Sequence, residues 1–312
     1  MTGFVYHEAY LKHHTGFGHP ESPQRLVSIH QHLANQKLSD KLHHIQPFQA
    51  DLSWIELNHS PDYIKHVENA TKRHVSYLDS GDTGVCPESF EIARLAVGGC
   101  QAAVDAIMQG KVENVFCAVR PPGHHALYDR AMGFCIFNNI AIAARYIQKQ
   151  YDLRKVLIVD WDVHHGNGTQ ASFYSDPTVF YFSTHQYPHY PGTGHQSEKG
   201  DGDGFGFTLN VPLKAGSDDE DYISAFETQL VPAAQKFHPD FILISAGFDA
   251  YINDPLSYML VSIKGFGKMT QIVKDLAEAY CEGRLISTLE GGYDLGGLSQ
   301  CVEEHLLVLM KK

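Results

Sequence analysis

The chain has 312 residues, of which 43% are hydrophobic and 19% are charged, so it is long enough to bury one large core. Its formal net charge of −12 argues against direct binding to nucleic acid phosphates. No stretch approaches the roughly 18 apolar residues that a membrane helix requires, and the first residues lack the pattern of a signal peptide.

Short apolar runs alternate along the chain with longer segments of helical periodicity. Strands are predicted, in chain order, at residues 115–119, 155–160, 179–182, 207–211, 241–245 and 285–289. Helices are predicted at about residues 24–36, 61–71, 88–108, 138–150, 220–237, 265–282 and 298–310.

Two of the predicted strands read Val-Leu-Ile-Val and Phe-Ile-Leu-Ile, without the polar alternation of a half-exposed strand. Strands that alternate with helices form mostly parallel sheets with helices on both faces. We therefore expect an α/β fold in which a central, mostly parallel sheet is flanked by helices on both faces. No linker or charge block divides the sequence, so we expect a single domain over residues 1–312.

The six cysteines form no Cys-x-x-Cys pair, which argues against a zinc finger or a thioredoxin-like site. Free thiols suit a reducing compartment, so we expect a cytoplasmic protein. The chain has 20 histidines, and one histidine alone therefore carries little information. The pairs His13-His14 and His43-His44 lie in polar surroundings and are expected at the surface.

Polar residues directly follow four of the predicted strands. In open parallel sheets, ligands bind beyond the carboxyl ends of the strands. The four segments are Arg120-Pro121-Pro122-Gly123-His124-His125, Asp160-Trp161-Asp162-Val163-His164-His165-Gly166-Asn167-Gly168, Ala246-Gly247-Phe248-Asp249 and Glu290-Gly291-Gly292-Tyr293. Acids, histidines and a tyrosine are therefore expected at one edge of the sheet.

These acids and histidines have the composition of a metal site. In an extended chain alternate residues face the same side, so Asp160, Asp162 and His164 can converge. An aspartate after a strand is, taken singly, commonly a helix cap, but carboxylates brought together repel unless they are protonated or bound to a metal. The set Asp162, His164 and Asp249 offers three ligands and leaves a position of a catalytic zinc ion open.

The same segments resemble the signature of the histone deacetylase and acetylpolyamine amidohydrolase family, in the family's order. The matching blocks are RPPGHH at 120–125, DWDVHHGNGTQ at 160–170, SAGFD at 245–249 and LEGGY at 289–293, together with HPESPQRL at 19–26 and YPGTG at 190–194. Asn167 resembles the class II branch and its bacterial relatives, and the resemblance runs from about residue 5 to residue 308. It implies an arginase/deacetylase-like fold and a zinc-dependent amidohydrolase that removes acetyl or related acyl groups from amines such as acetyl-lysine.

The resemblance implies two kinds of metal site. The zinc ligands would be Asp162, His164 and Asp249. A structural potassium ion would be held by Asp160, Ser183 and the main-chain carbonyls of Asp162, His164 and Thr184. A second monovalent site would lie near Phe173, Asp176, Val179 and Tyr222.

The resemblance also assigns catalytic roles. His125, oriented by Asn167, would act as the general base and then as the general acid. His124, oriented by Asp160, would hold a positive charge near the developing oxyanion. Tyr293 would donate a hydrogen bond to the same oxyanion.

Five further positions are implied to contact the substrate. Gly133, Phe134 and Tyr190 would form the wall of a narrow apolar tunnel, and Asp82 would lie at its rim. The tunnel mouth would carry Leu256, at a position where a glutamate favours cationic polyamines. A leucine favours acetyl-lysine, whereas the acidic chain and the similarity of Asp-Pro-Leu-Ser-Tyr to bacterial acetylpolyamine amidohydrolases leave acetylated polyamines as the alternative substrates. An oligomer is possible, and no nucleic acid or membrane partner is expected.

Two other functions and one other motif fit less well. A manganese ureohydrolase of the arginase type needs a second aspartate where this chain has Asp249-Ala250-Tyr251. A non-catalytic acyl-lysine-binding scaffold could lose His125 or Tyr293, and both are present. The glycine- and aspartate-rich run at residues 200–206 neither follows a strand nor opens a helix, so we interpret it as a loop that leads into a strand.

Overall fold

The computed structural model describes residues 1–79 and 81–311. Its centre is an eight-stranded sheet in the order β2-β1-β5-β10-β9-β6-β7-β8, and every neighbouring pair in it is parallel. The strands are β1 (Thr2–Val5), β2 (His43–Ile45), β5 (Asn114–Cys117), β6 (Val156–Asp160), β7 (Val179–Gln186), β8 (Thr208–Leu213), β9 (Phe241–Ala246) and β10 (Leu285–Leu289). The short strands β3 (Tyr77–Leu78) and β4 (Thr83–Gly84) form a separate antiparallel pair.

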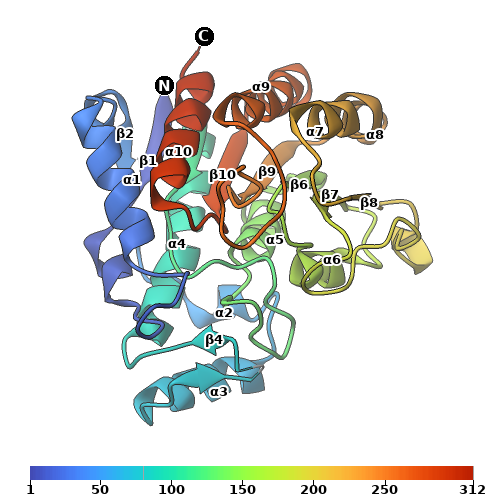
Figure 1. The fold of residues 1–312 in the computed structure, drawn as a ribbon. Coiled ribbons are helices and arrows are strands. Elements are labelled where there is room, and N and C mark those ends of the chain that lie inside the picture. Colours follow the sequence, from blue (N-terminus) through green and yellow to red (C-terminus); the bar gives the residue numbers. More distant parts are fainter. Residues whose placement is uncertain (80, 312) are drawn as a thin grey trace.

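Helices cover both faces of the sheet (Figure 1). One layer contains α1 (Gln24–Asn35), α7 (Asp219–Ala225), α8 (Val231–Phe237), α9 (Ile263–Tyr280) and α10 (Leu295–Leu309). The other contains α2 (Leu52–Ile55), α3 (Pro61–Lys72), α4 (Ser89–Met108) and α5 (Asn139–Tyr151), with α6 (Asn167–Phe173) beside β7. The predicted α/β fold, with a central parallel sheet between two helical layers, is thus confirmed.

The sheet is buried between these layers because its central strands are apolar on both faces. Every residue of β6, β9 and β10 is buried. Such strands cannot leave one face in water, so each face must be covered by a helix that contributes an apolar side. The strands therefore run in one direction, and their carboxyl ends meet at one edge of the sheet.

Side chains fix the beginnings of the helices that leave this edge. The side-chain oxygen of Asn138 accepts a hydrogen bond from the main-chain nitrogen of Ala141 at the start of α5. Asp294 caps α10 in the same way, through the nitrogen of Gly297. Caps of this kind satisfy main-chain donors that have no partner inside the helix.

Some of the predicted elements and positions differ in the structure. The predicted helix at 220–237 is divided into α7, a wider π turn over Phe226–Leu230, and α8. Pro232 stands at the start of α8, where its ring and its missing N–H disrupt regular helical hydrogen bonding. His13, which was expected at the surface, is wholly buried and contacts the Ser89 hydroxyl.

The run at residues 200–206 contains a single 3₁₀ turn and leads into β8, as expected of a loop. Among the described residues, no helix is both long and apolar enough to cross a membrane.

Candidate active site at the carboxyl edge of the sheet

The segment after β6 turns sharply instead of staying extended. The Asp160 carboxylate accepts a hydrogen bond from the nitrogen of Asp162 at 3.2 Å, and the Asp162 carboxylate accepts one from the nitrogen of His164 at 2.9 Å. These bonds hold two consecutive bends. The prediction of an extended chain after Asp160 is therefore wrong, and Asp160 does not belong to the group that Asp162 and His164 form.

Asp249, which follows β9, completes a group of three with Asp162 and His164. One ligand atom from each residue lies within 4.8 Å of the others, and all three residues are buried. The Nδ1 atom of His164 lies 3.1 Å from an oxygen of each carboxylate. A single ring proton cannot be shared well by two carboxylates, whereas a cation between the three groups satisfies all of them.

The electrostatics of this group point the same way. Burial lowers the pKa of His164, but its hydrogen bonds to Asp162 and Asp249 and their charges raise it to about 10. Burial and the charge of Asp162 raise the pKa of Asp249. No lysine or arginine of the described chain forms an ion pair with either carboxylate, and the cations within reach are the histidines His124 and His164. A metal ion would take the place of the His164 proton that the two carboxylates share.

A glycine permits the close approach of the last strand to this group. A side chain at Gly291, just after β10, would place its first carbon 2.0 Å from an oxygen of Asp249. The nitrogen of Gly291 instead donates to Asp162 at 2.7 Å. The Glu-Gly-Gly-Tyr segment can therefore pack directly against the two carboxylates.

His124 forms a hydrogen bond through Nδ1 to the Asp160 carboxylate, at 3.0 Å. The hydroxyl of Tyr181 donates to the same oxygen at 3.0 Å. Burial lowers the pKa of His124, but the charges of Asp160, Asp162 and Glu290 raise it to about 10. His124 is therefore positively charged near neutral pH.

His125 has a different partner and a different charge. Its Nδ1 atom lies 2.8 Å from the side-chain oxygen of Asn167, the first residue of α6. That oxygen can only accept, so Nδ1 carries the ring proton and Nε2 is left with a lone pair. Burial and the charge of His124 lower the pKa of His125 well below its usual value. The neighbouring histidines thus differ in charge, one cationic and one neutral.

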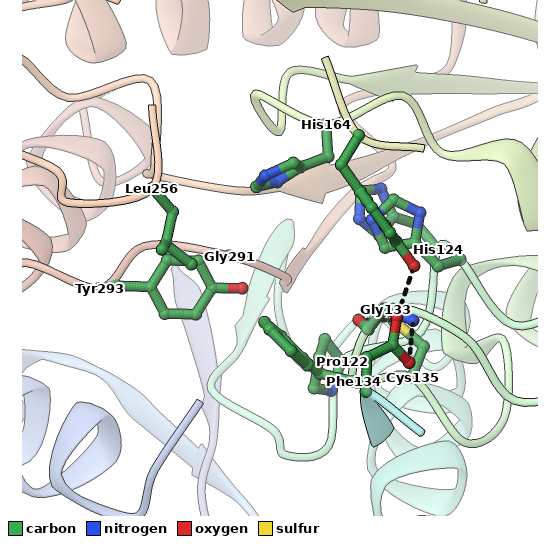
Figure 2. Close-up of a pocket in the computed structure, with 12 residues that line it drawn as sticks. Pro122, His124, Gly133, Phe134, Cys135, His164, Leu256, Gly291 and Tyr293 are labelled. Atoms are coloured by element: carbon green, nitrogen blue, oxygen red, sulfur yellow. Dashed lines mark hydrogen bonds between the residues drawn. The ribbon is translucent and has the colours of Figure 1, made fainter. Parts of the chain in front are cut away.

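A cavity of about 220 Å³ leads to these residues. Figure 2 shows Tyr293 on one side of the cavity, with its hydroxyl directed toward the interior and facing His164 and His124. No hydrogen-bond partner for that hydroxyl is found among the described residues. The cavity is lined by Asp82, Pro122, His124, His125, Gly133, Phe134, Cys135, His164, Tyr190, Leu256, Gly291 and Tyr293.

The five positions expected to contact a substrate all line this cavity. Asp82 accepts hydrogen bonds from the hydroxyl of Tyr190 at 2.9 Å and from the nitrogen of Gly133 at 3.2 Å, so it joins two parts of the wall. Gly133 has a φ of +55°, and an added side-chain carbon would lie 2.3 Å from the ring of His125. Only glycine lets the wall and the histidine pack together there.

The residues expected to bind potassium come from β6, β7 and the segment that follows β6. Asp160 and Ser183 are opposite each other in the register of β6 and β7. Ser183 and Thr184 are wholly buried, and Ser183 contacts the ring of His185 at 2.9 Å. The hydroxyl of Tyr222 is buried without a hydrogen-bond partner among the described residues.

Several residues that hold the site together lie in the matched sequence blocks at 19–26 and 120–125, but their roles were not predicted. Arg25 donates from Nε to the carbonyl of Gly292 at 2.7 Å, and its guanidinium lies 5.0 Å from the centre of the Tyr293 ring. Glu21 accepts from Arg120 at 2.7 Å and also pairs with Arg25. Burial raises the pKa of Glu21, but Arg120 lowers it to about 2.

The roles of Glu290 and Asp254 were not predicted either, although both lie in segments that the sequence analysis names. The Glu290 carboxylate accepts from the nitrogens of Gly123 and His124, at 2.7 and 3.1 Å, and from the Ser245 hydroxyl at 3.1 Å. Asp254 accepts from the nitrogen of Tyr293 at 2.6 Å. Contacts to main-chain nitrogens carry no signal in a sequence motif.

Residues 19–309 match the model of the histone deacetylase domain. The chain is 39% identical over 299 residues to a protein of Archaeoglobus fulgidus named probable deacetylase, covering 95% of this chain and 82% of that one. It is 38% identical to the mouse protein named Polyamine deacetylase HDAC10, over 96% of this chain and 47% of that protein. The crystal structure of the HDA15 HD domain is similar with a TM-score of 0.94 and 40% identity, over 99% of this chain and 87% of that one.

Proposed function

The chain belongs to the histone deacetylase family, and we propose on that premise that it is a zinc-dependent amidohydrolase that removes acetyl or related acyl groups from amines such as acetyl-lysine. The observation that carries the proposal is the meeting of Asp162, His164 and Asp249 at a cavity that is also lined by His125 and Tyr293. A metal site beside a neutral histidine and a free phenol has the parts that amide hydrolysis needs.

Zinc fits the three residues well. Two carboxylates and one imidazole are ligands that this ion accepts, and three protein ligands are the usual number at a catalytic zinc site. When bound, zinc polarises an amide carbonyl and lowers the pKa of a water molecule toward about 7. In this proposal Asp162, His164 and Asp249 hold the ion, and Gly291 lets the chain pass close to them.

His125 moves the proton in this proposal. Its Nε2 atom is the acceptor because Nδ1 donates to Asn167. It takes a proton from the attacking water and returns it to the nitrogen of the leaving amine. Asn167 cannot take up the charge, so its part is to fix the ring and its tautomer.

Two groups would stabilise the negative charge that develops on the amide oxygen. His124 is held cationic by Asp160, and it supplies positive charge close to the reacting atoms. The Tyr293 hydroxyl, which faces the cavity, donates a hydrogen bond from the opposite side. Neither group must reorganise as the charge appears, since both are fixed in advance.

Leu256 decides which class of substrate we propose. Leu256 lines the cavity and offers apolar contact to the methylene chain of a lysine, without a charge for a distal ammonium. Acetyl-lysine is therefore the proposed substrate class. Acetylated polyamines are the second candidate, supported by the net charge of −12 and by the similarity to a polyamine deacetylase.

A kinetic panel separates these candidates. We expect kcat/KM for acetyl-lysine peptides to equal or exceed that for N-acetylated putrescine, cadaverine and spermidine. The variant Leu256→Glu should move the preference toward the polyamines, because it adds a charge at the mouth. A wild-type preference for acetylputrescine or acetylcadaverine of tenfold, about 1.4 kcal/mol, would replace acetyl-lysine by the second candidate.

Four further proposals accompany the catalytic one. A structural potassium ion is proposed near Asp160 and Ser183, which lie opposite each other across two strands, and a second monovalent ion near Phe173, Asp176, Val179 and Tyr222. One catalytic domain and a cytoplasmic location are also proposed. The first is supported by the single eight-stranded sheet, because the three proposed zinc ligands all follow strands of that sheet.

A further inference from the structure

Asp254 lies at the junction of two loops that border the cavity. Its side chain is 6% exposed. One carboxylate oxygen accepts from the nitrogen of Tyr293 at 2.6 Å and from that of Asp294 at 3.3 Å. The other oxygen accepts from the nitrogen of Leu256 at 2.9 Å. Both oxygens are therefore committed to main-chain donors, one to each loop.

No cationic side chain of the described chain pairs with Asp254. A buried carboxylate is costly, and here it is stabilised only by hydrogen bonds from the two loops. An amide of the same shape cannot replace it. Whichever way an asparagine is turned, its NH₂ group faces an N–H donor, so one loop loses its partner.

The two loops carry different parts of the proposed reaction. The loop after β10 carries Tyr293, whose hydroxyl faces the cavity, and the loop after β9 carries Leu256, which lines its wall. The Leu256 peptide is held from the other side as well, since His189 donates from Nε2 to its carbonyl oxygen at 3.0 Å. His189 also stacks on the ring of His164, with ring centres 5.1 Å apart.

We propose that Asp254 is a positioning residue that fixes the Tyr293 hydroxyl relative to the cavity wall at Leu256. The proposal rests on the proposed function, because it assigns Tyr293 a part in turnover. Asp254 forms no hydrogen bond with the metal ligands, and it is not proposed to contact the substrate. It acts through the main chain of Tyr293, whose hydroxyl is proposed to contact the reacting atoms. Loss of Asp254 should therefore lower kcat more than it weakens substrate binding.

The test compares Asp254→Asn with Asp294→Asn. The second variant is the matched control: it makes the same aspartate-to-asparagine change at the same junction, while asparagine still caps α10 through Gly297. Displacement of a catalytic group by about 1 Å costs on the order of 10²-fold in rate, so Asp254→Asn should lower kcat by about 10- to 100-fold. KM should change less than kcat, and Asp294→Asn should retain wild-type kinetics.

A double-mutant cycle separates positioning from a general loss of structure. If Asp254 acts through the Tyr293 hydroxyl, then Asp254→Asn should change kcat by less than about twofold once Tyr293→Phe has removed that hydroxyl. An equal loss of kcat in both backgrounds would show that the two residues act independently and would overturn the proposal.

Hydrogen exchange gives a readout that does not depend on activity. The amides of Leu256 and Tyr293 donate to Asp254, so at least one of the two peptides that cover residues 250–258 and 290–296 should exchange faster in Asp254→Asn, and neither should in Asp294→Asn. Unchanged exchange in Asp254→Asn would overturn the proposal. Inactive wild-type protein that showed the expected exchange would instead contradict the proposed function.

Discussion

The Nδ1 atom of His125 lies 2.8 Å from the side-chain oxygen of Asn167, so a neutral amide holds the histidine that we propose as the base. The neighbouring His124 is held by a carboxylate, Asp160, at 3.0 Å. A carboxylate stabilises an imidazolium and an amide does so only weakly. Two adjacent histidines are thereby set to different charge states, one cationic and one neutral, which is how one site can supply both a base and a fixed cation.

Replacement of His125 by alanine should remove proton transfer. We expect kcat to fall by about 10²–10⁴-fold, while bound zinc, measured by elemental analysis, stays at the wild-type level because His125 is not among the three ligands. Wild-type turnover in His125→Ala would require another general base.

Asn167→Asp should shift the pH profile of the reaction. A carboxylate beside Nδ1 raises the pKa of His125, so the base becomes protonated, and inactive, at a higher pH. The acid limb of kcat/KM should therefore move toward higher pH relative to the wild type. An acid limb at the same pH in both proteins would mean that His125 does not set it.

Asp249→Asn should remove most of the bound zinc. The change takes away one of the two carboxylates near His164 and leaves a weaker, neutral ligand. Zinc content and activity should fall together, whereas Asp294→Asn, which removes a carboxylate outside the group, should keep both. Stoichiometric zinc in Asp249→Asn would contradict the assignment of the metal site.

Tyr293→Phe should lower kcat and leave the fold intact. Loss of one oxyanion donor costs on the order of 10²–10³-fold in kcat, and the hydroxyl has no other partner in the described chain, so the melting temperature should not change. Tyr280→Phe, at the far end of α9, is the control for loss of a tyrosine hydroxyl. Full turnover in Tyr293→Phe would reduce Tyr293 to a packing residue.

Buried neutral histidines should make the fold less stable in mild acid. His305 lies between the hydroxyls of Thr270 and Ser287, each at 2.7 Å, and burial lowers its pKa to about 3. The unfolded chain binds a proton at His305 below about pH 6.5 and the folded chain does not, so stability falls as the pH falls through that value.

This one residue should cost about 2 kcal/mol of unfolding free energy between pH 7.5 and pH 5.0. Urea unfolding at the two pH values measures the loss. In His305→Gln, which is less stable throughout, the loss between the two pH values should be smaller than in the wild type by about that amount. An equal loss in both proteins would mean that His305 is not held neutral.

The strand ends could be predicted from the sequence because parallel strands deliver their last residues to the same edge. Asp162, His164 and Asp249 each follow an apolar run, and the structure brings them within 4.8 Å of one another. The wall residue Gly133 and the rim residue Asp82 could be expected only from the family resemblance, since none of the strands predicted from the sequence leads to them. Their place in the cavity depends on loops that have no periodic pattern.

Other features of the structure leave no recognisable pattern in the composition or periodicity of the sequence. Strands β1 and β2 have four and three residues, too short to show an apolar pattern. His13 lies between Lys12 and His14 in the sequence, but its ring is 3.7 Å from Glu21 in a wholly buried cluster. Asp254 binds main-chain nitrogens, and every residue except proline offers one, so no partner residue marks the contact in the sequence.

The contact between Arg25 and the carbonyl of Gly292 spans 267 residues. During synthesis the first of these residues leaves the ribosome long before the second exists. Strand β10 lies between β5 and β9 in the sheet, so the strand ends that carry His124 and Asp249 cannot be brought together before it is made. The site would thus be assembled only after most of the chain has left the ribosome, when β10 enters between its two neighbours.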